Sequence, residues 1–185
     1  MLRHVGLVIL LLGGPGCQAG EPPAPQPADS GATGRSTSSP ATFEGAPTTA
    51  DDGIPRWPVI VGGVRAQVRV ARTRAQHFSG LSGVKLRKNE GMLFMYGPKR
   101  VRGFWMKGCI MGLDIAWLTD DLKVMQIDTL GAPGPETTDA TMPRASSPRE
   151  VKFVLEMPAG WFDRHGVKAG AEVLVPTSLL RLKAE

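Results

Sequence analysis

The sequence predicts an α+β domain that is mostly β, built as a small, largely antiparallel sheet or a closed barrel with two short helices. Several short stretches alternate apolar and polar side chains, which is typical of half-buried strands. Turn residues separate these stretches at short intervals, so the connections are expected to be tight. Only two segments carry helix signals, and both are short. Many short strands with minor helices indicate a compact sheet or barrel.

The first expected strand covers residues 64–70, where valines and alanine alternate with arginine and glutamine. Thr73 and Gln76 then fit a capping box, in which each side chain bonds the backbone N–H of the other residue. A short helix should therefore follow Thr73 and end near Gly80. A second short helix is expected over 158–165, with Gly166 at its end.

The remaining elements follow from the same patterns. Residues 97–100 are expected to form a basic turn, and the Pro-rich segment 131–149 an irregular loop at the rim of a site. Further strands are expected over residues 92–96, 104–107, 113–118, 123–129, 151–157 and 173–175.

The first 17 residues are expected to be a signal peptide. A basic start precedes an apolar run from Val5 to Leu12, which is shorter than the ~20 residues of a membrane-spanning helix. The cut falls either before Cys17, which would then carry a lipid, or after Ala19. The position of Cys17 at the end of the apolar run favours the lipoprotein type. The protein is thus expected to be exported and anchored to a membrane, in the periplasm or at the cell surface.

Residues 18–55 are expected to be a disordered tether, and residues 56–185 a single β-rich domain. The tether is rich in Pro, Ser, Thr and Ala, so it has little apolar surface to bury. Either way of processing the signal removes Cys17 from disulfide pairing. Cys109 is then the only other cysteine, so the fold must depend on its hydrophobic core.

The expected domain is basic, with 20 Lys and Arg against 12 Asp and Glu, a formal charge of +8. Outside the cytoplasm such a charge suits an anionic membrane surface better than nucleic acid, although general solubility explains it equally well. Phosphate-loop, serine-hydrolase and zinc-protease motifs are lacking, so no cofactor or metal is expected and enzymatic activity is left open. We expect a monomer.

The segment FWMKGCIMGLDI, residues 104–115, mixes charged and apolar side chains. If it forms a hairpin that turns near residues 110–111, Lys107 faces Asp114 across the two strands. Trp105 would lie beside this pair on the same face. The hairpin is therefore expected to carry apolar side chains on one face and an ion pair with an indole on the other.

Five motifs in this chain occur together in a known family. They are ARTxxxxxSGL from Ala71, NEGMLF from Asn89, FWMK from Phe104, LDI from Leu113 and LEMPAGW from Leu155. Over roughly residues 65–175 the chain resembles the bacterial and archaeal family of domain of unknown function 192. The resemblance implies a small, β-rich, barrel-like domain that is often exported or lipid-anchored. It implies no activity.

The family pattern singles out five candidate ligand-binding residues, which are Glu90, Trp105, Lys107, Asp114 and Glu156. Such a pocket could bind a small polar ligand or cell-envelope component, for example a sugar stacked on the indole. The alternatives are an envelope hydrolase or lyase that uses the carboxylates, and a structural or interaction protein in which these charges stabilise the fold.

Metal binding and nucleophilic catalysis have weaker support from the sequence. Soft sulfur ligands for a metal are supplied by Met92, Met95, Met106, Cys109 and Met111, although Met is an ordinary core residue. Cys109 could act as a nucleophile with His77 or His165 as base, but no motif links either histidine to the thiol.

Overall fold

The computed structural model describes residues 42–185. The expected signal peptide, the lipidation at Cys17 and residues 18–41 of the expected tether lie outside the described residues. Within the described part, none of the helices has the length and apolar character needed to span a bilayer.

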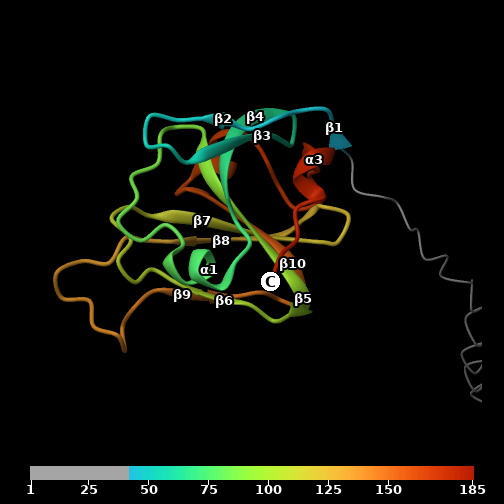
Figure 1. The fold of residues 1–185 in the computed structure, drawn as a ribbon. Coiled ribbons are helices and arrows are strands. Elements are labelled where there is room, and N and C mark those ends of the chain that lie inside the picture. Colours follow the sequence, from blue (N-terminus) through green and yellow to red (C-terminus); the bar gives the residue numbers. More distant parts are fainter. Residues whose placement is uncertain (1–41) are drawn as a thin grey trace, which may run out of the picture. The chain divides into compact units, whose positions relative to one another are not determined.

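The domain is built on a mixed sheet of nine strands (Figure 1). Eight of them lie in the order β1-β11-β3-β4-β5-β10-β7-β8, and β2 pairs with β3 beside this path. Only the β1–β11 and β4–β5 pairs are parallel, so the sheet is largely antiparallel as expected. The strands are β1 (Thr42–Phe43), β2 (Thr48–Thr49), β3 (Pro55–Val61), β4 (Val64–Ala71), β5 (Glu90–Arg100), β7 (Leu113–Leu118), β8 (Val124–Leu130), β10 (Val151–Pro158) and β11 (Val173–Pro176).

The sheet is open, so the expected closed barrel is wrong. A barrel needs a continuous ladder between the first and last strands of the sheet. Here a single isolated bridge, between Lys123 and Glu172, joins the segments that precede β8 and β11. The terminal strand β1 has two residues, which is too short to close the ladder.

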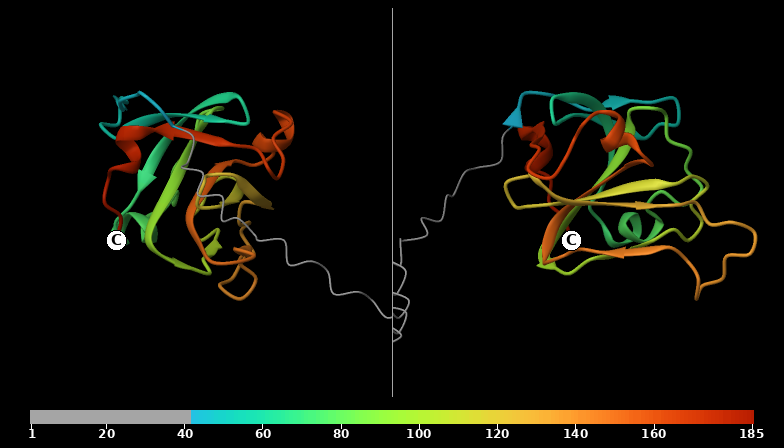
Figure 2. Two further views of the ribbon diagram at one scale, coloured as in Figure 1. Left: turned by 90° about the vertical axis from the view of Figure 1, so that its right-hand side faces the viewer. Right: turned by 180° about the vertical axis from the view of Figure 1, so that it is seen from behind.

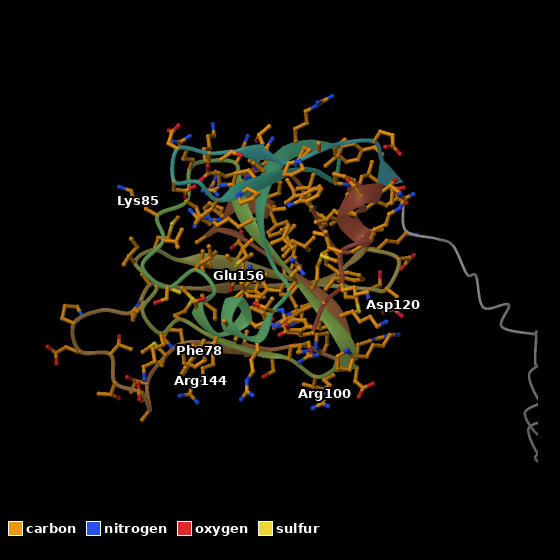
Figure 3. All side chains as sticks on the ribbon, in the orientation of Figure 1. Phe78, Lys85, Arg100, Asp120, Arg144 and Glu156 are labelled. Carbon is orange, nitrogen blue, oxygen red and sulfur yellow. The ribbon has the colours of Figure 1, made fainter. Side chains whose placement is uncertain are left out.

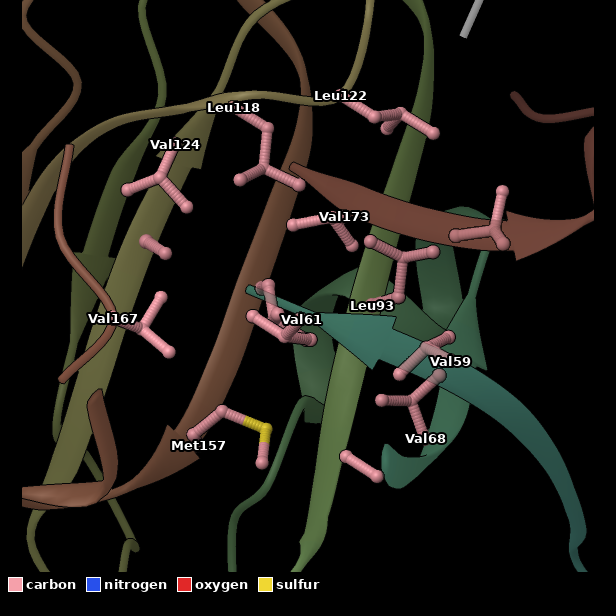
Figure 4. Packing of buried hydrophobic residues seen from close by; sticks show 14 of the residues in the cluster. Val59, Val61, Val68, Leu93, Leu118, Leu122, Val124, Met157, Val167 and Val173 are labelled. Atoms are coloured by element: carbon pink, nitrogen blue, oxygen red, sulfur yellow. The ribbon is translucent and has the colours of Figure 1, made fainter. Parts of the chain in front are cut away.

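Two hydrophobic cores lie on opposite faces of the central strands. The first core joins β3, β4 and β11 to one face of β5, β7 and β10, and Figure 4 shows its closely packed valines and leucines. The second core uses the other face of β5, β7 and β10, with Phe94 and Trp117 among its largest side chains. All six residues of β7 are consequently buried.

The second core is covered by small elements instead of a second sheet layer. Helix α1 (Arg74–Ser79) and the loop after it lie on one part of this face. A separate two-stranded ribbon, β6 (Gly103–Trp105) with β9 (Arg144–Ser146), lies at the bottom in Figure 1 and covers another part. Figure 2 shows the sheet and these covering elements from two further directions.

Several expected elements are confirmed and others need correction. The capping box at Thr73 and Gln76 is present, and α1 ends at Ser79 as predicted. The expected basic turn at 97–100 is wrong, because β5 continues to Arg100. There are three short helices in the described chain instead of two, which are α1, α2 (Trp161–Arg164) and α3 (Thr177–Leu180).

The expected hairpin of residues 104–115 is also wrong. β6 pairs with β9, whereas β7 pairs with β10 and β8. A strand that is buried on both faces and has neighbours on both sides leaves no free edge for β6. Residues 104–107 therefore do not pair with β7, and Phe104 instead packs edge to face on Trp117 of β7, with ring centroids 5.5 Å apart.

Strand pairing begins at Thr42, before the expected domain boundary at Arg56. The carboxylate of Asp52 holds this early segment in place, with its Oδ2 atom 2.7 Å from Nη2 of Arg56 and 2.9 Å from Nη2 of Arg69. The hydrogen bond from Arg56 is the main reason that the pKa of Asp52 is lowered. β3 was missed because Pro58 interrupts its pattern; this residue lies where β3 has only β4 beside it.

Gly91 allows the close approach of β5 to β10. A Cβ atom at this position would collide with the Glu156 carbonyl oxygen and the Met157 sulfur. Gly91→Ala is expected to lower the free energy of unfolding by about 2 kcal/mol or more, because the central strands must separate. Gly131→Ala is the matched control, since no atom lies within 4 Å of its Cβ position. Urea unfolding of both variants checks this, and equal midpoints would contradict it.

Candidate functional site

A cavity of about 160 Å³ lies over the second core, between α1, the loop after it and β6. Its walls combine aromatic rings with a few polar groups. The lining residues are His77, Phe78, Ser79, Gly80, Leu81, Ser82, Phe94, Tyr96, Gly103, Phe104, Trp105, Lys107, Cys109 and Glu156.

Glu156 is the carboxyl group of this cavity. Strand alternation in β10 places it on the same face as Val154, within the second core, and it is only 5 % exposed. No hydrogen bond or ion pair reaches its carboxyl group from residues 42–185. Burial without a compensating charge raises the pKa of Glu156 to about 8. The carboxyl group is therefore mostly protonated at neutral pH and has hydrogen-bonding capacity to spare.

Aromatic side chains form much of the remaining wall. Phe94 and Phe104 meet edge to face, with ring centroids 4.8 Å apart, and anchor the wall to the second core. Phe78 and Trp105 are 86 % and 42 % exposed, which is unusual for such large apolar rings. Figure 3 labels Phe78 and Glu156, which come from α1 and β10. Exposed rings beside a cavity offer apolar surface to a ligand.

The charged neighbours of Trp105 differ from those expected. Nζ of Lys107 is 5.0 Å from the centroid of the indole ring and 3.1 Å from Oδ2 of Asp139. The Arg144 guanidinium lies 5.7 Å from the same ring. The expected pairing of Lys107 with Asp114 is therefore wrong, and Asp139, from the long loop after β8, takes its place.

Three further titratable side chains, Cys109, Tyr96 and His77, line the cavity beside Glu156. Burial, and to a smaller extent the charge of Glu156, raises the pKa of Cys109 to about 11, so a nucleophilic thiolate is scarce at neutral pH. Burial is also the main reason that the pKa of Tyr96 is raised to about 12. Nε2 of His77 lies 2.9 Å from the Met95 carbonyl oxygen and 3.2 Å from that of Ala71. Because carbonyl oxygens only accept, Nε2 carries a proton.

Asp114 belongs to a different region. It lines a second cavity with α2 and β8, and it is only 1 % exposed. In contrast to Glu156, its carboxylate has three donors: Thr129 Oγ1 at 2.7 Å, the Gly160 N–H at 2.9 Å and the Phe162 N–H at 3.3 Å. These bonds fix the start of α2 against the central strands.

Glu90 lies at a third cavity, among charged residues near the start of β5. Its Oε1 atom is 3.8 Å from Nε of Arg56, and Oε2 accepts the Arg87 backbone N–H at 3.2 Å. Of the five candidate residues, the structure brings together Trp105, Lys107 and Glu156 and places Glu90 and Asp114 elsewhere. Across residues 42–185, no group of three or more His, Cys, Asp and Glu side chains is arranged to hold a metal ion.

The comparisons with known proteins confirm the family. The sequence pattern of DUF192, described as "Uncharacterized ACR", matches residues 59–175, which include every residue that lines the Glu156 cavity. The chain belongs to the DUF192 family. No curated protein matches it.

Two solved structures resemble this DUF192 domain. A protein of unknown function from Novosphingobium aromaticivorans is 30% identical, with a TM-score of 0.58; the alignment covers 69% of this chain and 91% of that one. A putative transcription regulator from Sinorhizobium meliloti is 25% identical, with a TM-score of 0.55, and the alignment covers 72% and 96%. Both alignments span nearly the whole of the other chain.

Sequence reasoning did not include several lining residues in the site. His77 and Phe78 come from α1, whose capping box was recognised but whose place over the second core was not. The signal for Phe78 was present, because a phenylalanine on a short polar helix has little core to enter. Arg144 was hidden in the expected loop, since only the pairing of β9 with β6 brings it to Trp105.

Loss of the Asp114 carboxylate should destabilise the fold. Asp114→Ala leaves the N–H groups of Gly160 and Phe162 and the hydroxyl of Thr129 without their acceptor. The free energy of unfolding should fall by about 3 kcal/mol or more, because buried donors without partners are unfavourable. Chemical denaturation measures the change.

Asp120→Ala is the control for this substitution. Asp120 forms an ion pair with Lys99, but both side chains are exposed, so a loss below about 1 kcal/mol is expected. Similar losses in the two variants would show that the buried hydrogen bonds of Asp114 do not stabilise α2.

Stability should depend on pH through Glu156. Its pKa is raised in the folded state, so the folded protein holds the proton more tightly than the unfolded chain. The stabilisation is fully present below the ordinary pKa of about 4.5 and is lost as pH rises to about 8. Glu156→Gln should remove this loss, and at pH 8 it should be more stable than the wild type by a few kcal/mol.

Thermal unfolding from pH 5 to 9 measures the difference between the two proteins. Glu150→Gln is the control, because that carboxyl group is exposed. Parallel stability curves for the wild type and Glu156→Gln would contradict a raised pKa at Glu156.

Proposed function

We propose that this DUF192 domain is a binding module for a small polar ligand, which enters the cavity beside Glu156. The observation that carries the proposal is the buried carboxyl group without a hydrogen-bond partner among the described residues. Buried polar groups are normally paired, and an unpaired one at a cavity wall is open to a partner from solution.

The lining favours a hydroxylated ring such as one sugar unit. A mostly protonated carboxyl group both donates and accepts, so it pairs with a hydroxyl in either direction. Trp105 and Phe78 supply apolar faces for the C–H surface of such a ring. The cavity volume of about 160 Å³ is below the range of drug-sized pockets, so it suits one ring or one end of a longer molecule.

The expected signal peptide and lipidation at Cys17 support a ligand from the cell envelope. We propose that the protein is exported, anchored by the lipid and held on a tether. Glycan components of the envelope are then the nearest source of hydroxylated rings. The basic surface of the domain would favour contact with the anionic membrane.

Hydrolysis is the weaker alternative for this cavity. The raised pKa of Glu156 suits a general acid near neutral pH, but glycoside hydrolysis generally needs two carboxyl groups that flank the bond. Glu156 is the sole carboxylate in the cavity lining, and Glu90 and Asp114 line other cavities. Ligand binding needs no second carboxyl group, so the lining of this cavity fits binding better than hydrolysis.

NMR titration with a panel of envelope-type monosaccharides and disaccharides tests the proposal. At least one saccharide should shift amide signals of α1, β6 and β10, and the shifts should saturate. Trp105→Ala and Glu156→Leu should each weaken that binding about tenfold, through loss of ring contact and of the acid's hydrogen bonds.

The matched controls are Trp57→Phe, which changes an aromatic residue of β3, and Glu150→Gln. Both should bind as the wild type does. The proposal fails if no saccharide shifts the signals of the cavity, or if Trp105→Ala and Trp57→Phe bind equally well.

A further inference from the structure

A fourth cavity, of about 490 Å³, shares His77 and Tyr96 with the Glu156 cavity but is lined mainly by arginines. It lies at the end of β5, where the chain leaves the central sheet. Its lining residues are Arg74, His77, Tyr96, Pro98, Arg100, Arg102 and Glu185. The cavity is therefore lined by three guanidinium groups and one carboxylate side chain.

The three arginines of this cavity are not ion-paired. No carboxylate of the described chain lies within 4 Å of their guanidinium nitrogens, whereas Arg56 and Arg69 both contact Asp52. The domain therefore has acidic side chains that pair with other arginines. The cavity holds positive charge that the described residues do not neutralise by direct contact.

Arg102 is held in a fixed position. Its guanidinium lies 3.8 Å from the centroid of the Tyr96 ring, and Nη2 donates to the Pro98 carbonyl oxygen at 2.6 Å. Its Nε atom is buried and has no hydrogen-bond partner in the described chain. Burial is the main reason that the pKa of Arg102 is lowered, and the nearby charge of Arg100 lowers it further. These arginines are kept together against their mutual repulsion.

A carboxylate already reaches the edge of this cavity. Oε2 of Glu185 accepts the backbone N–H of Arg74 at 3.1 Å. The Glu185 backbone is fixed as well, because its N–H donates to the Arg72 carbonyl oxygen at 2.9 Å and its own carbonyl oxygen accepts from Gly97 at 3.2 Å. An oxygen anion is thus accommodated at one end of the cavity, beside the unpaired arginines.

We infer that this cavity binds the phosphate group of an organic phosphate. Guanidinium groups present several N–H donors in a plane that matches phosphate oxygens, and their charge compensates the anion. The volume of about 490 Å³ exceeds that of a bare phosphate and lies within the range of small-molecule sites. The inference stands apart from the proposed saccharide site, because it depends on different charged residues.

The phosphate has two possible sources, which are a soluble phosphate ester and a phospholipid headgroup. Val101 lies between Arg100 and Arg102 and is 61 % exposed, so it could enter a membrane interface next to the cavity. A soluble ester needs only the cavity itself. Both sources bring the same phosphate chemistry to the same arginines.

The experiment uses the full chain and two probes. Glycerol phosphate is titrated by calorimetry, and vesicles of phosphatidylcholine with and without phosphatidic acid are tested by co-sedimentation. Saturable binding of glycerol phosphate identifies a soluble ester as sufficient, and binding only to the vesicles that contain phosphatidic acid identifies the headgroup. Failure of both probes to bind overturns the inference.

Four variants separate the cavity from general basic charge. Arg100→Gln and Arg102→Gln should each weaken binding at least about tenfold, since each removes a charged donor. Arg65→Gln is the matched control, because it removes the same charge from an exposed position on β4. Glu185→Gln should strengthen binding several-fold, because it removes the one carboxylate side chain of the cavity.

The opposite directions expected for Arg102→Gln and Glu185→Gln guard against misfolding as the explanation. An equal loss in Arg65→Gln would show that net charge alone governs binding, and it would overturn the inference. Saccharide binding can fail without changing these results, so the two proposals are tested separately.

Discussion

The register of β10 between β5 and β7 is the constraint on which the rest of the structure depends. In this register Leu155 and Met157 enter the first core, while Val154 and Glu156 enter the second. A shift of one residue would exchange the two sets, because side chains alternate along a strand. Gly91 lets β5 approach closely enough to hold this register. The position of the candidate site is therefore decided by backbone pairing, and the side chains that surround it come from the elements that cover the second core.

Glu156 and Asp114 show how environment separates two buried carboxyl groups. Asp114 accepts three hydrogen bonds, two of which tie α2 to the central strands, so its burial is compensated within the fold. Glu156 is nearly as buried, but it has no such donors within residues 42–185, and burial raises its pKa to about 8. Burial of Glu156 without hydrogen-bond donors is unfavourable for the fold. Its position beside a cavity is therefore more easily explained by a ligand than by a role in stability. The sequence alone shows two carboxyl side chains, and only their surroundings in the fold distinguish a structural role from a candidate binding role.

Local patterns predicted the elements whose causes are local. Alternation located β4 and β10, and the capping box located α1. The predicted hairpin of residues 104–115 was wrong because pairing partners are set by the whole sheet. The sequence LDIAWL of β7 has apolar residues on both faces, which indicates a strand buried on both sides and argues against a simple hairpin with β6. Of the residues that the family resemblance grouped, Trp105, Lys107 and Glu156 line one cavity. Glu90 and Asp114 line other cavities, because a sequence motif does not specify where its residues lie in the fold.

The two proposed sites are linked through the wall that they share. The His77 and Tyr96 rings contact each other at a tilt, with centroids 4.1 Å apart. Besides burial, the charge of Arg102 lowers the pKa of Tyr96 and that of Glu156 raises it. Burial is the cause of the raised pKa of Glu156, and none of the cavity arginines contributes to it. Charge neutralisation in the arginine cavity is therefore expected to leave the protonation of Glu156 unchanged. An effect of one ligand on the other would need a movement of the shared His77 and Tyr96 side chains, and it would have to be equal in both directions because coupling between two sites is reciprocal.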